Sequence, residues 1–146
     1  MKTVTELLKS KPSQTVHTIA PTAPVLEAIK LMAEKHIGAL LVLEGERVAG
    51  IVTERDYARK VVLKSRSSAD TPVRDIMTAE VMFVRPDQTC EECMALMTDK
   101  RLRHLPVMDG DRLIGLVSIG DLVKEVISDQ QFTIEQLQHY ISGERG

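Results

Sequence analysis

The sequence is poor in aromatic residues and in cysteine, and this shortage excludes several classes of protein. Its 146 residues include two phenylalanines, two tyrosines and no tryptophan, which leaves little surface for stacking single-stranded nucleic acid. Two cysteines are too few for a disulfide scaffold. Nineteen basic against twenty-one acidic residues give a net charge of −2, so no overall field favours nucleic acid or an anionic membrane.

Long hydrophobic runs are missing as well. No apolar stretch approaches the ~18 residues of a membrane-spanning helix. The N-terminal residues also lack the apolar core of a signal peptide. We therefore expect a cytoplasmic protein with no membrane partner. Its hydrophobic content of 43% and charged content of 27% are ordinary for a globular domain.

What the sequence does contain is one pattern written twice, 65 residues apart. Gly50–Asp56 reads GIVTERD, and Gly115–Asp121 reads GLVSIGD. The same offset continues without a gap on both sides and aligns Leu31-Met32 with Leu96-Met97. Such a register indicates an internal duplication. Each copy of roughly 45 residues is near the lower size limit for independent folding, so we expect the copies to share a core.

Hydrophobic periodicity predicts the order β-α-β-β-α in both copies. In the first copy the expected strands cover 16–19, 39–43 and 48–52, and the first helix covers 25–36. A second helix follows the N-cap Thr53 and carries Tyr57, Val61 and Val62 on one side. In the second copy the strands cover 81–84, 104–108 and 113–117, and the helices cover 89–100 and 120–128.

Shorter segments flank and join the two copies. A short amphipathic helix is predicted over 3–10, and a polar, serine-rich linker over 63–71. Pro72 is expected at the first position of a helical turn that ends at Met77. A separate final helix is expected over 132–142, ending at Gly143. The predicted domains are 12–63 for repeat one, 64–77 for the linker and lead-in helix, 78–129 for repeat two, and 130–146 for the C-terminal helix and tail.

The duplicated motif combines two chemical features of a nucleotide site. Thr53 and Ser118 stand at strand-to-helix junctions, where free backbone N–H groups and the helix dipole attract an anion. Asp56 and Asp121 follow one turn later, and a carboxylate accepts hydrogen bonds from both hydroxyls of a ribose. Phosphate and ribose together describe a nucleotide. The alternative is that both aspartates only interact with the dipole of their own helix.

The two motifs carry a resemblance to a known family. Together with Arg103–Val107 and the lead-in Val73–Thr78, they resemble a tandem pair of cystathionine-β-synthase (CBS) domains, a Bateman module, over about residues 12–128. The resemblance implies an α/β (α+β) fold in which two β-α-β-β-α repeats pack as a pseudo-twofold pair, with short helices at both ends. It also implies two clefts, each lined by both repeats.

In such modules the motif aspartate of one repeat holds the ribose of an adenine nucleotide, and early strands of the other repeat contact the adenine. The resemblance therefore implies Asp56 and Asp121 as ribose ligands. Phosphate or ribose contacts are implied for Thr53, Arg55, Arg103, His104, Ser118 and Gly120. Adenine contacts are implied for Val81, Met82, Leu102 and Pro106 in the cleft of Asp56, and for His17, Ile37, Gly38 and Ala39 in the cleft of Asp121. Because repeat one has Gly38-Ala39 where repeat two has Arg103-His104, we expect the clefts to differ in charge.

Two of these residues have a simpler interpretation. Arg55 offers a guanidinium fork to phosphate, or it is a solvated arginine that pairs with Glu54 or Asp56. His104 begins an apolar strand, where it either reaches the ligand or packs as an ordinary strand residue.

The sequence Cys90-Glu91-Glu92-Cys93 is a C-x-x-C pattern, which is typical of redox chemistry or of half a zinc site. In the duplicated register Cys90 and Cys93 align with Val25 and Ala28, which face the core of the equivalent helix. We therefore expect both cysteines to be buried structural residues, with redox sensing as the alternative. The other histidines have no cysteine or carboxylate at metal-binding spacing, so no metal site is expected.

The sequence favours a regulatory module over an enzyme, because no nucleophile–base pair, metal cluster or phosphate-binding glycine loop is present. No catalytic cofactor is expected. The expected ligand is an adenine nucleotide, AMP, ATP or NAD(H), sensed as a measure of energy or redox state. We also expect a homodimer and a regulated protein partner of unknown identity. The alternative is a structural interaction and dimerisation domain that binds no nucleotide.

Overall fold

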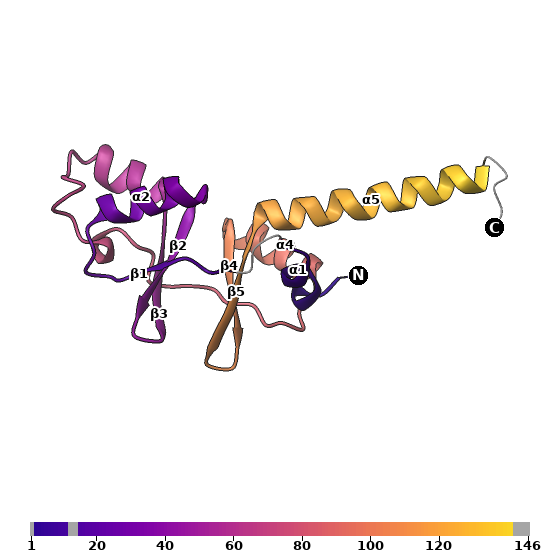
Figure 1. Cartoon of the computed structure of the whole chain (residues 1–146), viewed down its shortest axis with the longest axis horizontal. Coiled ribbons are helices and arrows are strands. Elements are labelled where there is room, and N and C mark those ends of the chain that lie inside the picture. Colours follow the sequence, from indigo (N-terminus) through magenta and orange to yellow (C-terminus); the bar gives the residue numbers. More distant parts are fainter. Residues whose placement is uncertain (1, 12–14, 142–146) are drawn as a thin grey trace.

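The computed structural model describes residues 2–11 and 15–141. The chain forms two lobes that lie side by side, one for each repeat, and a long helix leaves the second lobe (Figure 1). Among the described residues, no helix is both long and apolar enough to cross a membrane.

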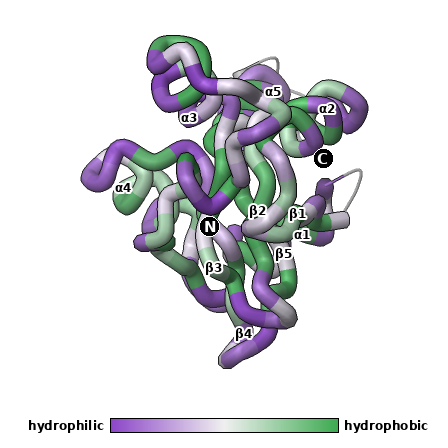
Figure 2. The backbone as a smooth tube through the Cα atoms, turned by 90° about the vertical axis from the view of Figure 1, so that its left-hand side faces the viewer, coloured by the Kyte–Doolittle hydropathy of each residue, from purple (hydrophilic) through white to green (hydrophobic). Residues whose placement is uncertain are grey.

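Repeat one contains a three-stranded sheet with the order β1-β2-β3. β1 runs parallel to β2, and β2 runs antiparallel to β3. The first four residues of β2 are all buried, as a continuous apolar run predicts, and Figure 2 shows the hydrophobic colouring of this strand. The elements are β1 (Thr18–Ile19), α2 (Val25–Lys35), β2 (Ala39–Glu44), β3 (Arg47–Thr53), α3 (Glu54–Tyr57) and a π-helical turn over Ala58–Val62.

Repeat two reproduces this hairpin. Its elements are α4 (Cys90–Lys100), β4 (His104–Asp109), β5 (Arg112–Ser118) and α5 (Ile119–Ile141). The β4–β5 pairing has the register of β2–β3, and both ladders shift at the equivalent valines, Val42 and Val107. The tips of both hairpins place a glycine in the left-handed region, with φ of 65° at Gly45 and 62° at Gly110. The duplication therefore extends to the details of strand pairing.

The first strand differs between the repeats, and both predicted ranges were too long. In repeat one only Thr18–Ile19 is a strand. In repeat two the predicted strand over 81–84 is reduced to a single parallel bridge between Val84 and Val107. The backbone N–H of Leu41 donates to the carbonyl of His17 over 3.3 Å. The residue equivalent to Leu41 is Pro106, which has no N–H to donate, so the ladder cannot extend.

Two helix predictions in repeat one and the linker also need correction. Val61 is buried but Val62 is 55% exposed, because neighbouring residues point about 100° apart around a helix. Pro72 is the cap of a short 3₁₀ helix over Val73–Asp75 and not its first residue, since its extended backbone pairs with Pro24.

The predicted separate C-terminal helix does not exist. α5 runs without a break from Ile119 to Ile141, because no glycine or proline occurs between Gly120 and Ile141. Its predicted end at Ser142 and Gly143 lies outside the described residues.

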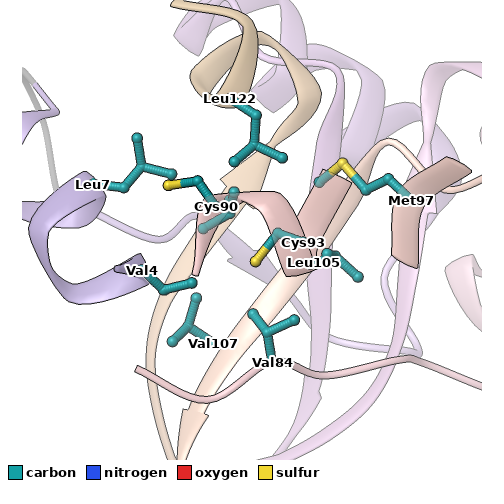
Figure 3. Close-up of a cluster of buried hydrophobic side chains, with 10 residues drawn as sticks. Val4, Leu7, Val84, Cys90, Cys93, Met97, Leu105, Val107 and Leu122 are labelled. Carbon is teal, nitrogen blue, oxygen red and sulfur yellow. The ribbon is translucent and has the colours of Figure 1, made fainter. Parts of the chain in front are cut away.

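The hydrophobic core is not shared between the repeats, which corrects the expectation from size. Two separate clusters of buried side chains form, one in each lobe. The cluster of repeat two includes Val4 and Leu7 (Figure 3), which belong to α1 (Val4–Ser10). The cluster of repeat one includes Val73 and Ile76, from the segment that leads into repeat two. Each repeat thus completes its core with the lead-in of the other.

The first lead-in (residues 2–11) and the second lead-in (residues 71–80) begin at equivalent places in the two lobes. The N–H of Cys90 donates to the carbonyl of Lys2 over 3.0 Å, and the N–H of Val25 donates to the carbonyl of Thr71 over 2.8 Å. Thr3 bridges to Thr89 as Pro72 bridges to Pro24. A position in the first lead-in therefore corresponds to the position 69 residues later in the second. This crossed exchange holds the repeats together and forms the boundaries of the clefts between them.

Candidate functional site

Two cavities lie between the repeats, and Gly38 and His104 line both of them. The larger one, named cleft A, has a volume of about 770 Å³ and is formed by α1, the start of repeat one and the β5–α5 junction. The smaller one, named cleft B, has a volume of about 330 Å³ and is formed by the β3–α3 junction, residues 78–82 and residues 101–104.

The structure groups most of the predicted site residues as the sequence implied. Cleft A is lined by His17, Ile37, Gly38, Ala39, His104, Ser118 and Asp121. Cleft B is lined by Gly38, Thr53, Arg55, Asp56, Val81, Met82, Leu102, Arg103 and His104. Each motif aspartate thus lies in a cleft with residues of the other repeat.

Two predicted contacts do not line either cleft. Pro106 is buried in β4, where its carbonyl accepts a hydrogen bond from the N–H of Val84 over 3.0 Å. Gly120 is exposed in the first turn of α5, beside the hydroxyl of Ser118. Pro106 shares a face of β4 with His104, but it lies two residues further along the strand, beyond the residues that line the clefts.

Both motif aspartates are fixed by helix caps. The N–H of Asp56 donates to the Thr53 hydroxyl over 3.1 Å, and the N–H of Thr53 donates to the Asp56 carboxylate over 3.0 Å. The corresponding bonds between Asp121 and Ser118 are 3.1 Å and 2.9 Å. The interpretation as helix-start acids therefore describes real contacts. These same contacts hold each half-buried carboxylate at the edge of its cleft.

Each aspartate also has a lysine partner, but the two lysines come from different places. Nζ of Lys60 lies 3.2 Å from Oδ1 of Asp56, one turn further along the same segment. Nζ of Lys11 lies 2.9 Å from Oδ2 of Asp121 and donates to the carbonyl of Leu116 over 2.9 Å. Lys11 follows α1, so this ion pair ties the first lead-in to the motif of repeat two.

The surroundings of Asp121 favour its charged form. Burial by itself would raise the pKa of the Asp121 carboxyl, but the hydrogen bond from the Ser118 backbone and the ion pair with Lys11 outweigh it, so the pKa lies below its ordinary value. Asp121 is therefore an anion at neutral pH, as a ribose ligand should be.

His104 lies between the two clefts and does not supply positive charge at neutral pH. Burial lowers the pKa of His104, and Arg103 and Lys11 lower it further, against the opposing effect of Asp121. A neutral imidazole can donate one hydrogen bond to a ligand and accept another. Of the predicted phosphate contacts at this position, Arg103 is therefore the cationic one.

The two clefts differ in charge, mostly through residues that sequence reasoning missed. The charged lining of cleft A consists of Lys9, Lys11, Lys35, Lys124 and Asp121. That of cleft B consists of Arg55, Arg101, Arg103, Glu54, Asp56 and Glu80. Cleft A thus has an excess of positive charge, and cleft B is balanced. The missed residues lie outside the duplicated motif, so no local pattern indicated that Lys11 and Glu80 line a cleft.

The cysteines lie apart from the clefts. Cys90 and Cys93 are free and buried in the core of repeat two (Figure 3), which confirms the expectation of structural burial. Burial raises the pKa of the Cys93 thiol to about 11, so little of the reactive thiolate exists at neutral pH. No group of three or more potential metal ligands occurs among residues 2–11 and 15–141.

Comparison with known proteins identifies relatives over most of the chain. The CBS domain family matches twice, at residues 4–63 and 73–128. The solved structure of a CBS-domain protein from Burkholderia ambifaria MC40-6, assigned to signal transduction, is 64% identical, with a TM-score of 0.86 over 91% of this chain and 99% of that one.

Two other relatives extend beyond this chain. The mitochondrial CBS domain-containing protein CBSX3 of Arabidopsis thaliana is 44% identical over 82% of this chain, which spans only 60% of that relative. A hexameric CBS-CP12 protein from bloom-forming cyanobacteria is 31% identical, with a TM-score of 0.75 over 84% of this chain and 66% of that one. Because one relative is mitochondrial, the cytoplasmic location stays a prediction.

Proposed function

The chain belongs to the CBS domain family, and from this membership we propose that it is a regulatory module that binds an adenine nucleotide in clefts A and B. Tandem CBS domains generally serve regulation and signal transduction. The proposed ligands are AMP, ATP or NAD(H), so that the module senses energy or redox state. It performs no catalysis of its own.

The observation that carries the proposal is the equivalent placement of Asp56 and Asp121. Each carboxylate is fixed by a cap, lies beside a helix N-terminus and borders a cavity that the other repeat helps to line. An anionic carboxylate suits the two hydroxyls of a ribose, and the adjacent N–H groups suit a phosphate.

Binding can regulate because the clefts lie between the repeats. A nucleotide that contacts both repeats favours the arrangement in which its contacts are best, and it shifts the population by its differential affinity for the two arrangements. A protein partner that contacts both lobes would respond to this shift.

The test is a thermal-shift series on nucleotide-free protein with AMP, ADP, ATP, NAD⁺, NADH and GTP. A ligand at ~100 times its Kd stabilises a single-site protein by about 2.7 kcal/mol, or several degrees in Tm. We expect shifts with adenine nucleotides and smaller shifts with GTP. The double variant Asp56→Asn/Asp121→Asn should lose the thermal shifts with adenine nucleotides while keeping its fold. Flat curves for the wild type would reject the proposal.

A structural interaction domain is the second candidate, and α5 is the observation that favours it. This helix projects from the second lobe (Figure 1) and exposes Ile127, Ile134 and Leu137 by 49%, 53% and 56%. We propose that this surface serves homodimerisation, alone or together with nucleotide binding. Both functions can coexist because α5 beyond its first turns does not line the clefts.

A further inference from the structure

The two lead-ins bring residues of opposite charge into the two clefts. Leu8 approaches Gly115 as Met77 approaches Gly50, again with an offset of 69 in the lead-in. Beyond this point the lead-ins differ in backbone, because α1 stays helical to Ser10 whereas Thr78 pairs with Ile51 as an isolated bridge. The ends of the two lead-ins line different clefts, with Lys11 in cleft A and Glu80 in cleft B. One cleft thus receives a cation from its lead-in and the other a carboxylate.

Lys11 lies beside Asp121, the proposed ribose ligand of cleft A. Its ammonium lies 2.9 Å from the Asp121 carboxylate, and a second bond to the Leu116 carbonyl fixes its direction. Both side chains are partly withdrawn from solvent, with 25% of Lys11 and 17% of Asp121 exposed. Partial burial weakens screening by salt, so this cation acts more strongly on a bound anion than a surface lysine does.

The remaining lining has the same asymmetry. Lys9, Lys35 and Lys124 add positive charge around cleft A from three separate elements. In cleft B, Glu54, Asp56 and Glu80 oppose the three arginines. Cleft A is also the larger cavity, with about 770 Å³ against about 330 Å³.

We propose that the two clefts divide their ligands by phosphate count: cleft A takes a nucleoside di- or triphosphate and cleft B a nucleotide of low charge, with Lys11 and Glu80 as the residues that set this difference. The inference rests on the proposed function, since it assumes that both clefts bind nucleotides. Each added phosphate brings negative charge and acceptor oxygens, which the lysines of cleft A can bind. In cleft B the carboxylate of Glu80 repels a longer phosphate chain.

The experiment is isothermal titration calorimetry of the full chain with ATP and with AMP, in two backgrounds. Asp56→Asn should remove binding in cleft B, so titration of this variant measures the affinity of cleft A. Asp121→Asn should remove binding in cleft A, so titration of that variant measures the affinity of cleft B. The charge swaps Lys11→Glu and Glu80→Lys and the milder variant Lys11→Gln are all placed in each background, so a Lys11 variant remains if Lys11→Glu fails to fold. Lys64→Glu, an exposed linker residue outside both clefts, controls for the change in net charge.

We expect ATP to bind more tightly than AMP in the cleft A background and no more tightly than AMP in the cleft B background. Lys11→Gln removes one charged hydrogen-bond donor, so it should weaken the binding of ATP in cleft A about tenfold and the binding of AMP by less. Glu80→Lys should strengthen ATP in cleft B, and Lys64→Glu should change neither affinity. Inorganic tripolyphosphate should bind cleft A more weakly than ATP does, because it lacks the ribose and adenine.

Several outcomes would overturn the inference. Equal effects of Lys11→Gln on ATP and AMP, or a preference of cleft B for ATP, would contradict it while leaving nucleotide binding intact. Tripolyphosphate binding as tight as ATP would mean that cleft A is a polyphosphate site without nucleotide recognition, and would also reject it. No binding of any nucleotide by the wild type would instead reject the proposed function itself.

Discussion

At the scale of single residues, Gly50 and Gly115 stand at equivalent positions in the two hairpins but have different neighbours. A Cβ on Gly50 would lie 2.7 Å from the carbonyl oxygen of Thr78, which two backbone hydrogen bonds to Ile51 hold in place. The three atoms nearest to a Cβ on Gly115 all belong to the Leu8 side chain, and the nearest would lie at 2.8 Å. The equivalent glycines are therefore not equally replaceable.

We predict that Gly50→Ala lowers the free energy of unfolding by about 1–3 kcal/mol, the usual cost of overpacking. Gly115→Ala should cost less, because the Leu8 side chain can rotate away. Urea denaturation of both variants measures the difference. A larger loss for Gly115→Ala would show that α1 is packed more rigidly than the second lead-in.

The charge of Asp121 gives a prediction for the pH dependence of stability. Because its pKa is lowered in the folded state, the folded protein binds fewer protons here than the unfolded chain. The resulting stabilisation is present above the ordinary carboxyl pKa of about 3.9 and is lost as the pH falls through the lowered value.

We therefore expect Asp121→Asn to be less stable than the wild type at pH 6. The difference in unfolding free energy between the two proteins should narrow as the pH falls below about 4. Denaturant unfolding at a series of pH values measures it. A gap that stays constant down to pH 2 would mean that Asp121 stabilises the fold through its shape and cap, and not through its charge.

At the scale of elements, α5 is longer than its repeat requires. Its equivalent in repeat one ends near Val62, whereas α5 continues to Ile141. Val123, Ile127, Ile134 and Leu137 are each about half exposed. With Gln130 between them, their spacing of four, three, four and three residues is typical of a coiled-coil seam. A second copy of α5 would cover this face.

We predict that Ile134→Asp raises the dissociation constant of the homodimer by about tenfold or more, because it places a charge in the apolar seam. Gln136→Asp adds the same charge on the opposite side of the helix and should have little effect. Sedimentation velocity at several concentrations measures both. Identical association of the two variants would exclude this face of α5 from the interface.

At the scale of the whole molecule, the crossed lead-ins make the two repeats depend on each other. Leu7 is buried in the core of repeat two and Ile76 in the core of repeat one, although each precedes the other repeat in sequence. Removing either side chain leaves a cavity in the lobe that it fills, and not in the lobe that follows it along the chain.

We predict that Leu7→Ala and Ile76→Ala each destabilise the protein by about 2–5 kcal/mol. Hydrogen exchange should locate the effects in different lobes. Leu7→Ala should raise exchange first in β4 and β5, and Ile76→Ala first in β2 and β3. The same exchange pattern in both variants would indicate that the lobes unfold as one unit.

The sequence by itself determined the features that depend on local pattern and on the duplication. The 65-residue register predicted both hairpins, since alternation and turn residues fix a hairpin within a few positions. The caps at Thr53 and Ser118 followed from residue type. The family resemblance then grouped Asp56 with Val81 and Asp121 with His17, as the clefts do.

Only the tertiary structure decided which lead-in packs on which repeat, and therefore what stands beside each aspartate. Lys11 and Asp121 are 110 positions apart in the sequence, and nothing in their local patterns connects them. Their contact exists because Val4 and Leu7 fill the core of repeat two, where burial of apolar surface is worth more than any surface charge pair. The packing of the apolar face of α1 thus placed Lys11 beside Asp121 in cleft A.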